Sequence, residues 1–299
     1  MTDPFTIETA GLKKNYDGVE AVRGLDLQVP TGSIFGFLGK NGAGKTTTIK
    51  VLLGMSRPTA GVARVFGLAA DAPEDSVAVR RRTAFVSEER DLYDYMTVEQ
   101  MIRFTAGFFP RWRADLEQQY LRMFDLPRDR KVRALSRGMR TKLALLLALC
   151  RGAELLILDE PTSGLDPAVT EQVLQALVKH VAAQETTVFF SSHQIAEVDQ
   201  IADRIAIVDA GRSVVSGALD DIRQRFRRVQ IVFEGPAPDI AFRSAGAGRV
   251  RREGRVLTVL SSAGAEGILE EARALGPVAV DVVPVTLKEI FLETVAGEA

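Results

Sequence analysis

The chain has 299 residues and a formal net charge of −1, with 38 basic and 39 acidic residues. This length allows one large domain or two smaller ones, with a sizeable core. The balance of charge argues against a nucleic-acid-binding protein, which usually carries a basic excess or patch. The single cysteine, Cys150, lies in an apolar run, so we expect a buried thiol and a reducing compartment rather than a disulfide within the chain.

The sequence shows neither a recognisable signal peptide nor a membrane span. Residues 1–5 contain no basic region followed by an apolar one. No apolar stretch approaches the roughly 18–20 residues that a helix needs to cross a bilayer. We therefore expect a cytoplasmic protein that reaches a membrane only through a partner.

The first two thirds of the chain predict strands that alternate with helices. We expect strands at 5–12, 24–29, 33–38, 62–66 and 83–87, a helix at 45–54, and a mostly helical block at 97–135 that Pro110 breaks. Helix and strand then alternate through 137–150, 154–158, 167–183, 187–191, 195–202 and 204–208. This order predicts an α/β domain over 1–220 with a helix-covered, mainly parallel sheet and a helical subdomain at about 97–150.

The sequence after residue 220 predicts a separate small α+β domain, 221–299. We expect strands at 229–233, 249–252, 256–260 and 278–283, and helices at 239–244, 265–275 and 287–295. The resulting order, β-α-β-β-α-β, is that of a split-βαβ, ferredoxin-like domain.

A phosphate-binding loop is predicted between the strand 33–38 and the helix that follows it. The segment fits the pattern G-x-x-x-x-G-K-[ST] and consists of Gly39, Lys40, Asn41, Gly42, Ala43, Gly44, Lys45, Thr46 and Thr47. Backbone amides of such a loop and of the helix N-terminus bind phosphate. We expect Lys45 to reach the β- and γ-phosphates of ATP and Thr46 to bind Mg²⁺. A chance glycine-rich turn is the alternative, which the flanking strand and helix disfavour.

Two carboxylates follow the apolar strand 154–158. A carboxylate at Asp159 would hold Mg²⁺ beside Thr46, and Glu160 would orient or deprotonate the attacking water. His193 follows another predicted strand, where a sensor of the γ-phosphate would lie, although a purely structural histidine is the alternative. His180 has no such context, and we expect it on the surface.

A second anion site is indicated by Ser136-Arg137-Gly138, a Ser-x-Gly turn that opens the predicted helix 137–150. One molecule cannot easily direct both this turn and the phosphate loop at the same phosphate. The sequence therefore predicts an ATPase that is complete only as a dimer.

Taken in order, these motifs resemble the ATP-binding subunit of an ABC transporter over about residues 5–220. The correspondence assigns Walker A to 39–47, the signature to 135–139, Walker B to 155–159, the D-loop to 163–166 and the switch histidine to His193. The segment 285–293 also looks like the subgroup that serves ABC-2-type exporters. The resemblance implies a P-loop NTPase fold of the ABC type, with antiparallel N-terminal strands and an inserted helical subdomain.

The resemblance also implies a head-to-tail dimer with two ATP molecules and Mg²⁺ at its interface. Ser136 and the Gly138 backbone would contact the γ-phosphate bound by Lys45 of the other copy. Tyr16 resembles the aromatic residue that stacks on adenine, with a core tyrosine as the alternative, and Val22 would add an apolar contact. The dimer would drive a separately encoded membrane permease, as an exporter, from the inner face of the membrane. The alternative function is a soluble ABC-type ATPase that acts on nucleic acid or ribosomes.

Three positions depart from the family's pattern. Arg137 and Met139 replace a glycine and a glutamine of the signature, whereas Ser136 and Gly138 are retained. Glu88 stands where a glutamine usually contacts Mg²⁺ and the membrane partner, so we expect its metal contact to depend on pH or state. Lys40 replaces a frequent proline and has no assigned role.

Aromatic residues gather where the family docks a coupling helix of its membrane subunit. They lie in the segments 92–96 and 104–112. We expect Phe104 and Phe108 in the core of the subdomain and some of the other aromatic side chains on its surface.

Overall fold

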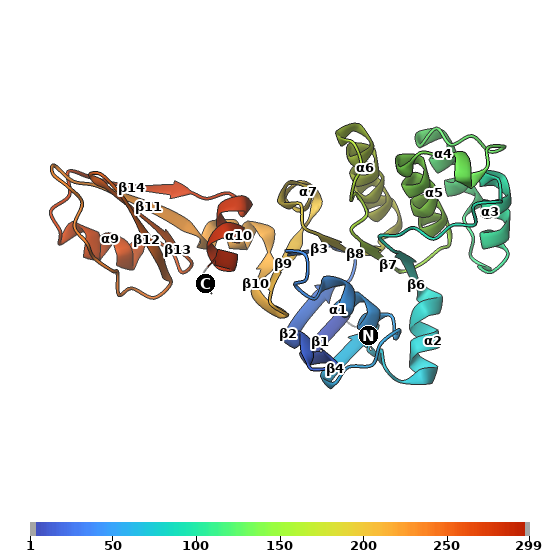
Figure 1. Ribbon diagram of the computed structural model, residues 1–299, viewed down its shortest axis with the longest axis horizontal. Helices are drawn as coiled ribbons and strands as arrows, with labels where there is room; N and C mark the ends of the chain where they lie inside the picture. The colour runs from blue at the N-terminus through green and yellow to red at the C-terminus, as the bar shows by residue number, and fades with distance from the viewer. Residues whose placement is uncertain (1–3, 297–299) are drawn as a thin grey trace. The chain divides into compact units, whose positions relative to one another are not determined.

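The computed structural model describes residues 4–296 and divides the chain into two compact units, Met1–Ser213 and Val214–Ala299 (Figure 1). The chain passes from the first unit to the second within β10 (Arg212–Ala218), upstream of the boundary expected after residue 220. Residues 1–3, which contribute to the expectation of no signal peptide, lie outside the described range. Among residues 4–296, no helix is both long and apolar enough to cross a membrane.

The central sheet of the first unit has the strand order β10-β9-β3-β8-β7-β6. Its parallel strands are β3 (Ile34–Gly39), β6 (Thr83–Val86), β7 (Leu155–Asp159), β8 (Thr187–Ser192) and β9 (Arg204–Asp209). β3, β7 and β8 are buried along their whole length, as expected for parallel strands covered on both faces. Because these strands run in the same direction, the loops that follow β3, β7 and β8 meet at one edge of the sheet.

An antiparallel sheet forms the N-terminal part of the same unit. Its order is β2-β1-β4-β5, with bounds β1 (Phe5–Tyr16), β2 (Val19–Pro30), β4 (Ala60–Val65) and β5 (Leu68–Ala69). Helix α1 (Lys45–Leu52) packs between the two sheets, and its residues Ile49 and Leu52 share a buried cluster with Val29 and Phe37. Figure 1 shows α1 on one side of the central sheet and α5, α6 and α7 on the other.

The remaining helices of the unit are α2 (Pro73–Arg82), α3 (Val98–Ala106), α4 (Ala114–Met123), α5 (Arg137–Cys150), α6 (Pro167–Gln184) and α7 (Ile195–Ile201), with a 3-10 turn at Val132–Ala134. The expected break at Pro110 is confirmed, since α3 ends before it and α4 begins after it. Thr97 is the N-cap of α3, and its side chain forms a capping box with Gln100. Cys150 is fully buried at the end of α5, and burial raises the pKa of its thiol.

The second unit contains a four-stranded sheet of order β12-β13-β11-β14, antiparallel throughout. Its elements are α8 (Leu219–Arg225), β11 (Arg227–Val232), β12 (Ala247–Glu253), β13 (Val256–Ser261), α9 (Glu266–Arg273), β14 (Ala279–Pro284) and α10 (Leu287–Ala296). β13 lies between β11 and β12, and β11 lies between β13 and β14, which is the strand arrangement of a split βαβ.

The prediction of a helix at 239–244 in the second unit is wrong. Residues 239–244 are not helical. The backbone amides of Arg243 and Ser244 donate instead to the carboxylate of Glu271 on α9, at 2.9 and 2.7 Å. The first crossover of this sheet is therefore an irregular segment tied to α9.

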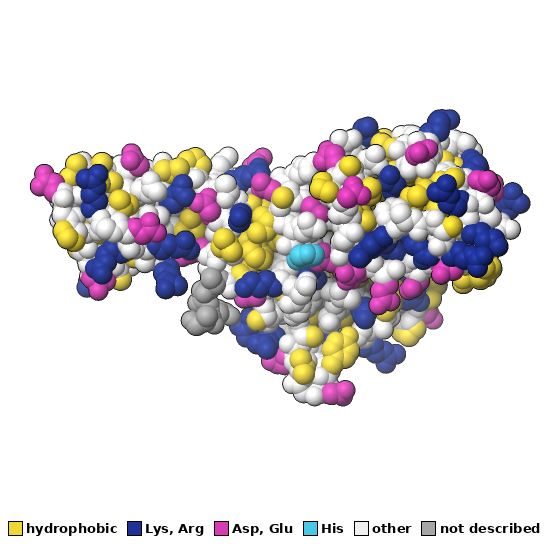
Figure 2. All heavy atoms as spheres, turned by 45° about the horizontal axis from the view of Figure 1, so that its top comes forward, with side chains coloured by type: hydrophobic (Ala, Val, Ile, Leu, Met, Phe, Trp, Pro, Cys, Tyr) yellow, Lys and Arg dark blue, Asp and Glu magenta, His cyan; other side chains and the backbone are white. Residues whose placement is uncertain are grey.

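Surface charges of both signs are interspersed on the face of the molecule drawn in Figure 2. Asp and Glu side chains lie among the Lys and Arg side chains there, and several Lys and Arg side chains gather at the right of the view.

Candidate functional site

The loop between β3 and α1 has the backbone of a phosphate cradle. Gly42 and Gly44 have φ of 82° and 99°, in the left-handed region that glycine adopts readily. A Cβ on Gly44 would lie 2.4 Å from the carbonyl oxygen of Ala21, so a larger residue would push the loop away from β2. Gly44 is the N-cap of α1 and offers no side-chain acceptor to the amides of the first turn. Those amides are therefore available to an external anion.

Lys45, the first residue of α1, points back into this loop. Its Nζ donates to the carbonyl oxygens of Gly39 and Lys40, at 2.8 and 3.2 Å. The same Nζ lies 3.1 Å from Glu160 Oε1, and the two side chains are only 6% and 7% exposed. This contact lacks hydrogen-bond alignment, and Glu160 Oε1 has no other partner among the described residues. A buried cation and a buried carboxylate oxygen thus remain open to a further ligand.

The end of β7 places two carboxylates side by side. Asp159 Oδ1 accepts from Ser191 Oγ at 2.5 Å, and the same hydroxyl accepts from the backbone amide of Glu160 at 2.9 Å. Ser191 on β8 therefore fixes the side chain of Asp159 and the backbone of Glu160 together.

His193 follows β8 and contacts Glu160 directly. Its Nδ1 lies 2.8 Å from Glu160 Oε2, and its backbone amide donates to the same oxygen at 3.3 Å. The imidazole is partly exposed and lines the cavity described next. The structure thus brings together Lys45, Glu160 and His193, three residues that the sequence placed in one site.

A cavity of about 500 Å³ lies over these groups. Its lining residues come from β2, the phosphate loop and the start of α1, the loop after β6, and the segments that follow β7 and β8: Ala21, Asn41, Gly42, Gly44, Lys45, Thr46, Thr47, Glu88, Glu160, Ser163 and His193. Gly39 and Ala43 of the phosphate loop are buried beneath it.

Two of the three groups expected to hold a phosphate-bound cation, Thr46 and Glu88, line the same cavity. Thr46 is exposed and Glu88 lies on the loop after β6, whereas Asp159 is buried at the end of β7 and is not among the lining residues. Among the described residues, no cluster of three or more His, Cys, Asp or Glu side chains could hold a metal ion unaided. This donor set fits Mg²⁺, which typically takes one or two protein ligands, phosphate oxygens and water.

Ser136 and Gly138 do not line this cavity. Ser136 is the N-cap of α5, where its Oγ accepts from the backbone amide of Met139 at 3.2 Å. A Cβ on Gly138 would lie 3.3 Å from Val169, so glycine allows α5 to approach α6 closely. Within one chain, the signature turn and the phosphate loop are therefore separate, as the sequence predicted.

Two residues expected beside the nucleotide lie outside the cavity. Tyr16 is 41% exposed, with its hydroxyl 3.1 Å from Ser56 Oγ and Lys14 Nζ 4.6 Å from its ring centroid. This exposure disfavours the alternative of a core tyrosine. Val22 is 1% exposed and belongs to the core, which corrects the expected apolar contact. Because side chains alternate along a strand, Ala21 rather than Val22 lines the cavity.

Three residues near the site were not singled out from the sequence. Ser191 orients both carboxylates, as described above. Glu197 on α7 accepts from Thr162 and Ser192 at 2.6 and 3.0 Å, and burial raises its pKa. Arg90 is buried beside the segment after β7, and its burial lowers its pKa. None belongs to a motif pattern, so only their spatial neighbours indicate their importance.

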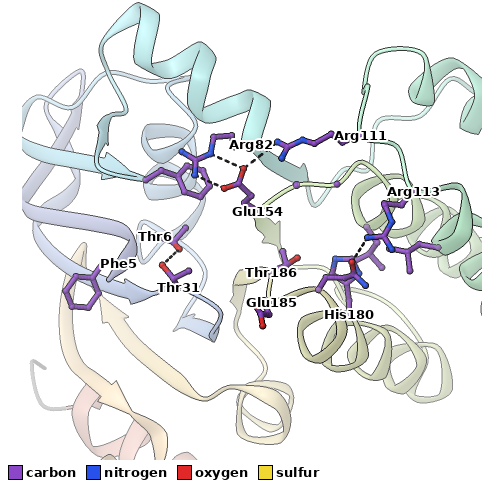
Figure 3. A pocket seen from close by; sticks show the side chains of 16 residues that line it. Phe5, Thr6, Thr31, Arg82, Arg111, Arg113, Glu154, His180, Glu185 and Thr186 are labelled. Carbon is purple, nitrogen blue, oxygen red and sulfur yellow. Dashed lines mark hydrogen bonds and ion pairs between the residues drawn. The ribbon is translucent and has the colours of Figure 1, made fainter. Parts of the chain in front are cut away.

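A second cavity, of about 510 Å³, lies at the opposite edge of the parallel strands (Figure 3). Arg82, Glu154 and Thr186, which immediately precede β6, β7 and β8, line it. Arg82 donates to both carboxylate oxygens of Glu154 at 3.1 and 2.6 Å, and Arg111 lies 3.5 Å from one of them. The cationic groups at this edge are thus already paired with protein carboxylate.

His180 also lines the second cavity, and its expected surface position is wrong. It is buried on the face of α6 that carries Val173 and Leu177, and its Nδ1 lies 3.0 Å from the hydroxyl of Tyr120. Burial lowers the pKa of His180 to about 4. The three-to-four-residue spacing from the buried valine and leucine was the sequence signal for this position.

An aromatic cluster is exposed on the helical subdomain. It consists of Tyr93, Tyr95, Phe104 and Phe108. Tyr93 contacts both Tyr95 and Phe104, and Phe104 contacts Phe108, with ring centroids 5.1 to 5.8 Å apart. Phe104 and Phe108 are exposed rather than part of the subdomain's core, which corrects the expectation for both. The core of the subdomain uses Tyr120 and Phe124 instead, which stack on each other.

Comparison with known proteins agrees with this geometry. Residues 22–163 match the family model described as ABC transporter, and residues 128–199 match one described as AAA domain, putative AbiEii toxin, Type IV TA system. The daunorubicin/doxorubicin resistance ATP-binding protein DrrA of Streptomyces peucetius is 38% identical, over 73% of this chain and 66% of its own length. The bacitracin transport ATP-binding protein BcrA of Bacillus licheniformis is 33% identical, over 74% of this chain and 72% of its own.

The chain belongs to the ABC transporter ATP-binding proteins. It is an ATP-binding subunit of the ABC ATPase class, and its enzyme activity is ATP hydrolysis. The ABC transporter ATP-binding protein YtrB of Bacillus subtilis is 26% identical over 98% of this chain and 99% of its own length. The similarity to this ABC protein therefore extends through the second unit.

Solved structures confirm the ABC fold of the first unit. The structure of an ATP-binding subunit of an ABC transporter superposes with a TM-score of 0.65 at 30% identity, over 73% of this chain and 92% of its own. The cassette MJ0796, solved as a dimer, has a TM-score of 0.64 at 21% identity, over 71% of this chain and 98% of its own.

Proposed function

We propose that this ABC protein pairs head to tail with a second copy around two MgATP molecules and powers a separate membrane permease. The proposal rests on one observation: the signature turn lies apart from a phosphate cavity that otherwise contains the expected residues. The cavity holds Lys45, Glu160 and His193, whereas Ser136 lies outside it. A second molecule can supply an equivalent serine and a helix N-terminus to the open side of the cavity.

Each residue of the cavity has a distinct proposed role. Lys45 binds the β- and γ-phosphates, exchanging its contact with Glu160 for the nucleotide. Glu160 accepts a proton from the attacking water, and His193, already in contact with that carboxylate, senses the γ-phosphate. Asn41, Gly42 and Gly44 present the loop backbone to the phosphates.

The proposed Mg²⁺ site consists of Thr46, Asp159 and Glu88. The ion supplies charge neutralisation on the β- and γ-phosphate oxygens. The Thr46 hydroxyl would hold the ion together with the Asp159 and Glu88 carboxylates, which would act directly or through water. Tyr16, which is 41% exposed at the end of β1, is the proposed adenine-stacking residue, and the exposure of its side chain fits this role.

Transport, and specifically export, is proposed from the relatives and from the exposed aromatic cluster. DrrA is named for drug resistance and BcrA for bacitracin transport. The aromatic cluster of Tyr93, Tyr95, Phe104 and Phe108 offers apolar surface to a partner. Contiguous exposed aromatic surface commonly marks an interaction site. We place the protein at the inner face of the membrane through this contact. Affinity purification of the tagged protein from membranes, with Phe108→Ser as a control that should lose the permease, tests this assignment.

Mixing two inactive variants tests the shared site. Ser136→Ala and Lys45→Ala chains should each lose turnover, by roughly 10²-fold or more for the serine if it contacts developing charge. In a head-to-tail mixed dimer, one of the two sites combines intact Lys45 with intact Ser136. We therefore expect mixing to restore part of the turnover. If the mixture is as inactive as its components while the Ser136→Ala chain, which keeps Lys45, still binds ATP, the head-to-tail arrangement is wrong.

A further inference from the structure

Arg90 is a buried cation in the loop after β6 that no family motif assigns. Its side chain is 6% exposed, and its backbone has φ of 53°, in the left-handed region that a non-glycine residue adopts only when its surroundings hold it there. Its own amide donates to the hydroxyl of Ser87 at 3.1 Å. The loop is therefore folded so that this guanidinium points inward.

The guanidinium binds the backbone that follows the proposed catalytic carboxylate. Arg90 Nη2 donates to the carbonyl oxygens of Glu160, Pro161 and Ser163, at 3.3, 3.1 and 3.5 Å. Arg90 Nη1 donates to the carbonyl oxygen of Glu88 at 3.0 Å. Hydrogen bonds from a charged donor are stronger than neutral ones, and several of them converge here on one short turn.

Glu160 is itself in an unusual backbone conformation. Its φ is 47°, and this conformation aims its carboxylate at Lys45 and His193. The amide of Glu160 donates to Ser191 Oγ, and its carbonyl accepts from Arg90 Nη2 at 3.3 Å and from the backbone amide of Ser163, in the same turn, at 3.1 Å. Both peptide groups that set the direction of this side chain are thus held by other residues.

Two more contacts tie the same turn to neighbouring loops. Ser163 Oγ donates to Glu88 Oε1 at 3.2 Å. A Cβ on Gly164 would lie 2.5 Å from Cζ of Arg137, so the arginine that replaces a signature glycine packs against the D-loop of its own chain. Neither contact reaches Glu160, which leaves Arg90 as the side chain that fixes its carbonyl.

We infer that Arg90 is a positioning residue for Glu160, which it holds in the orientation needed to accept a proton from water. The inference rests on the role proposed above for Glu160. Arg90 does not line the nucleotide cavity, so it acts through the backbone of the Glu160–Ser163 turn and not through ATP. Its removal should therefore affect the chemical step and leave nucleotide binding intact.

Arg90→Met tests the inference in the full-length protein. Methionine fills much of the same buried space and removes every donor. Because a displacement of about 1 Å at a reacting group can cost on the order of 10²-fold, we expect kcat to fall by about that factor, with KM for ATP within about twofold of the parent. Arg90→Lys, which keeps a charged donor, should recover part of the loss.

Arg151→Met is the matched control. Arg151 is also a largely buried arginine that donates to a backbone carbonyl, that of Arg80 at 2.9 Å, and it lies over the ring of Phe109. Within residues 4–296, neither its hydrogen-bond acceptor nor the ring that it covers belongs to the Glu160–Ser163 turn. We expect this variant to lower the melting temperature comparably while kcat per folded molecule stays within about twofold of the parent.

The Glu160→Gln background separates positioning from stability. If Arg90 acts through the carboxylate, Arg90→Met should cause no further loss of the residual rate in that background. A kcat of Arg90→Met within about twofold of the parent, an equal loss in Arg151→Met, or a further loss in the Glu160→Gln background would each overturn the inference. If Glu160→Gln alone retains parental turnover, the role of Glu160 fails first, and that result identifies the proposed function as the error.

Discussion

The two cavities at opposite edges of the parallel strands have nearly equal volumes, about 500 and 510 Å³, yet only one is built for phosphate. At the phosphate edge, Gly44 caps α1 without a side-chain acceptor, and Lys45 faces a carboxylate oxygen that has no aligned donor. At the opposite edge, Arg82 and Arg111 are already paired with Glu154. Neither the volume of a cavity nor the presence of basic residues around it therefore identifies an anion site. Backbone amides that lack an acceptor within the protein, together with a charged group whose hydrogen bonding is incomplete, do identify one.

Among substitutions that test this comparison, the largest effect is expected at the edge of the sheet that carries the phosphate loop. Glu160→Gln keeps the size of the side chain but removes the proton acceptor, so turnover should fall on the order of 10³-fold while ATP still binds. Steady-state phosphate release and equilibrium binding of a fluorescent ATP analogue measure the two quantities separately. Turnover close to that of the parent protein would remove Glu160 from the role of general base.

A smaller effect, on stability rather than turnover, is expected at the opposite edge. His180 has a folded-state pKa of about 4 against an ordinary value of 6.5. Between these values the unfolded chain binds a proton that the folded chain does not, so the free energy of unfolding falls as pH falls through this window. The contribution of His180 to the free energy of unfolding is complete well above pH 6.5. It should fall by about 2 kcal/mol between about pH 7.5 and about pH 5.

His180→Gln isolates this contribution, because glutamine can still bond the hydroxyl of Tyr120 and does not titrate. Urea unfolding of both proteins at the two pH values gives the difference. An equal pH dependence in the parent and the variant would show that His180 is not responsible.

The smallest effect is expected for Glu154→Gln at the same edge. Its ion pair with Arg82 is more than one-third exposed, and solvent screens it, so its loss should cost at most about 1 kcal/mol, or a melting temperature lower by roughly 2–4 °C. Turnover should not change. A drop in kcat would mean that the two edges are coupled, and the contrast drawn above would fail.

Much of the phosphate edge could be predicted from the sequence, because its geometry is local. The G-x-x-x-x-G-K-[ST] loop joins β3 to α1 directly, and Glu160 and His193 each follow their strand within two residues. Parallel strands then bring these loops together without further information. The separation of Ser136 from Lys45 was predicted on a different ground: one molecule cannot easily direct both the Ser-x-Gly turn and the phosphate loop at the same phosphate.

The remaining features depend on contacts distant in sequence. Arg90 and Glu160 are 70 residues apart, and nothing in either local sequence indicates that one binds the backbone of the other. Helix α2 was missed because it buries only Ser76 and Val79, so its apolar periodicity is weak. In the second unit, the helix expected at 239–244 does not form, because two backbone amides of this segment donate to the carboxylate of Glu271 on α9.

The burial of Cys150 has a practical consequence for observing this protein at work. Its thiol is inaccessible, and its raised pKa keeps it protonated and unreactive toward maleimides and similar reagents. Since the chain has one cysteine, a cysteine introduced on the surface would be the sole reactive thiol. Spin labels, fluorophores or cross-linkers can thus be attached at single chosen positions without first replacing a native residue, and distances between the two copies of the proposed dimer can be measured through a catalytic cycle.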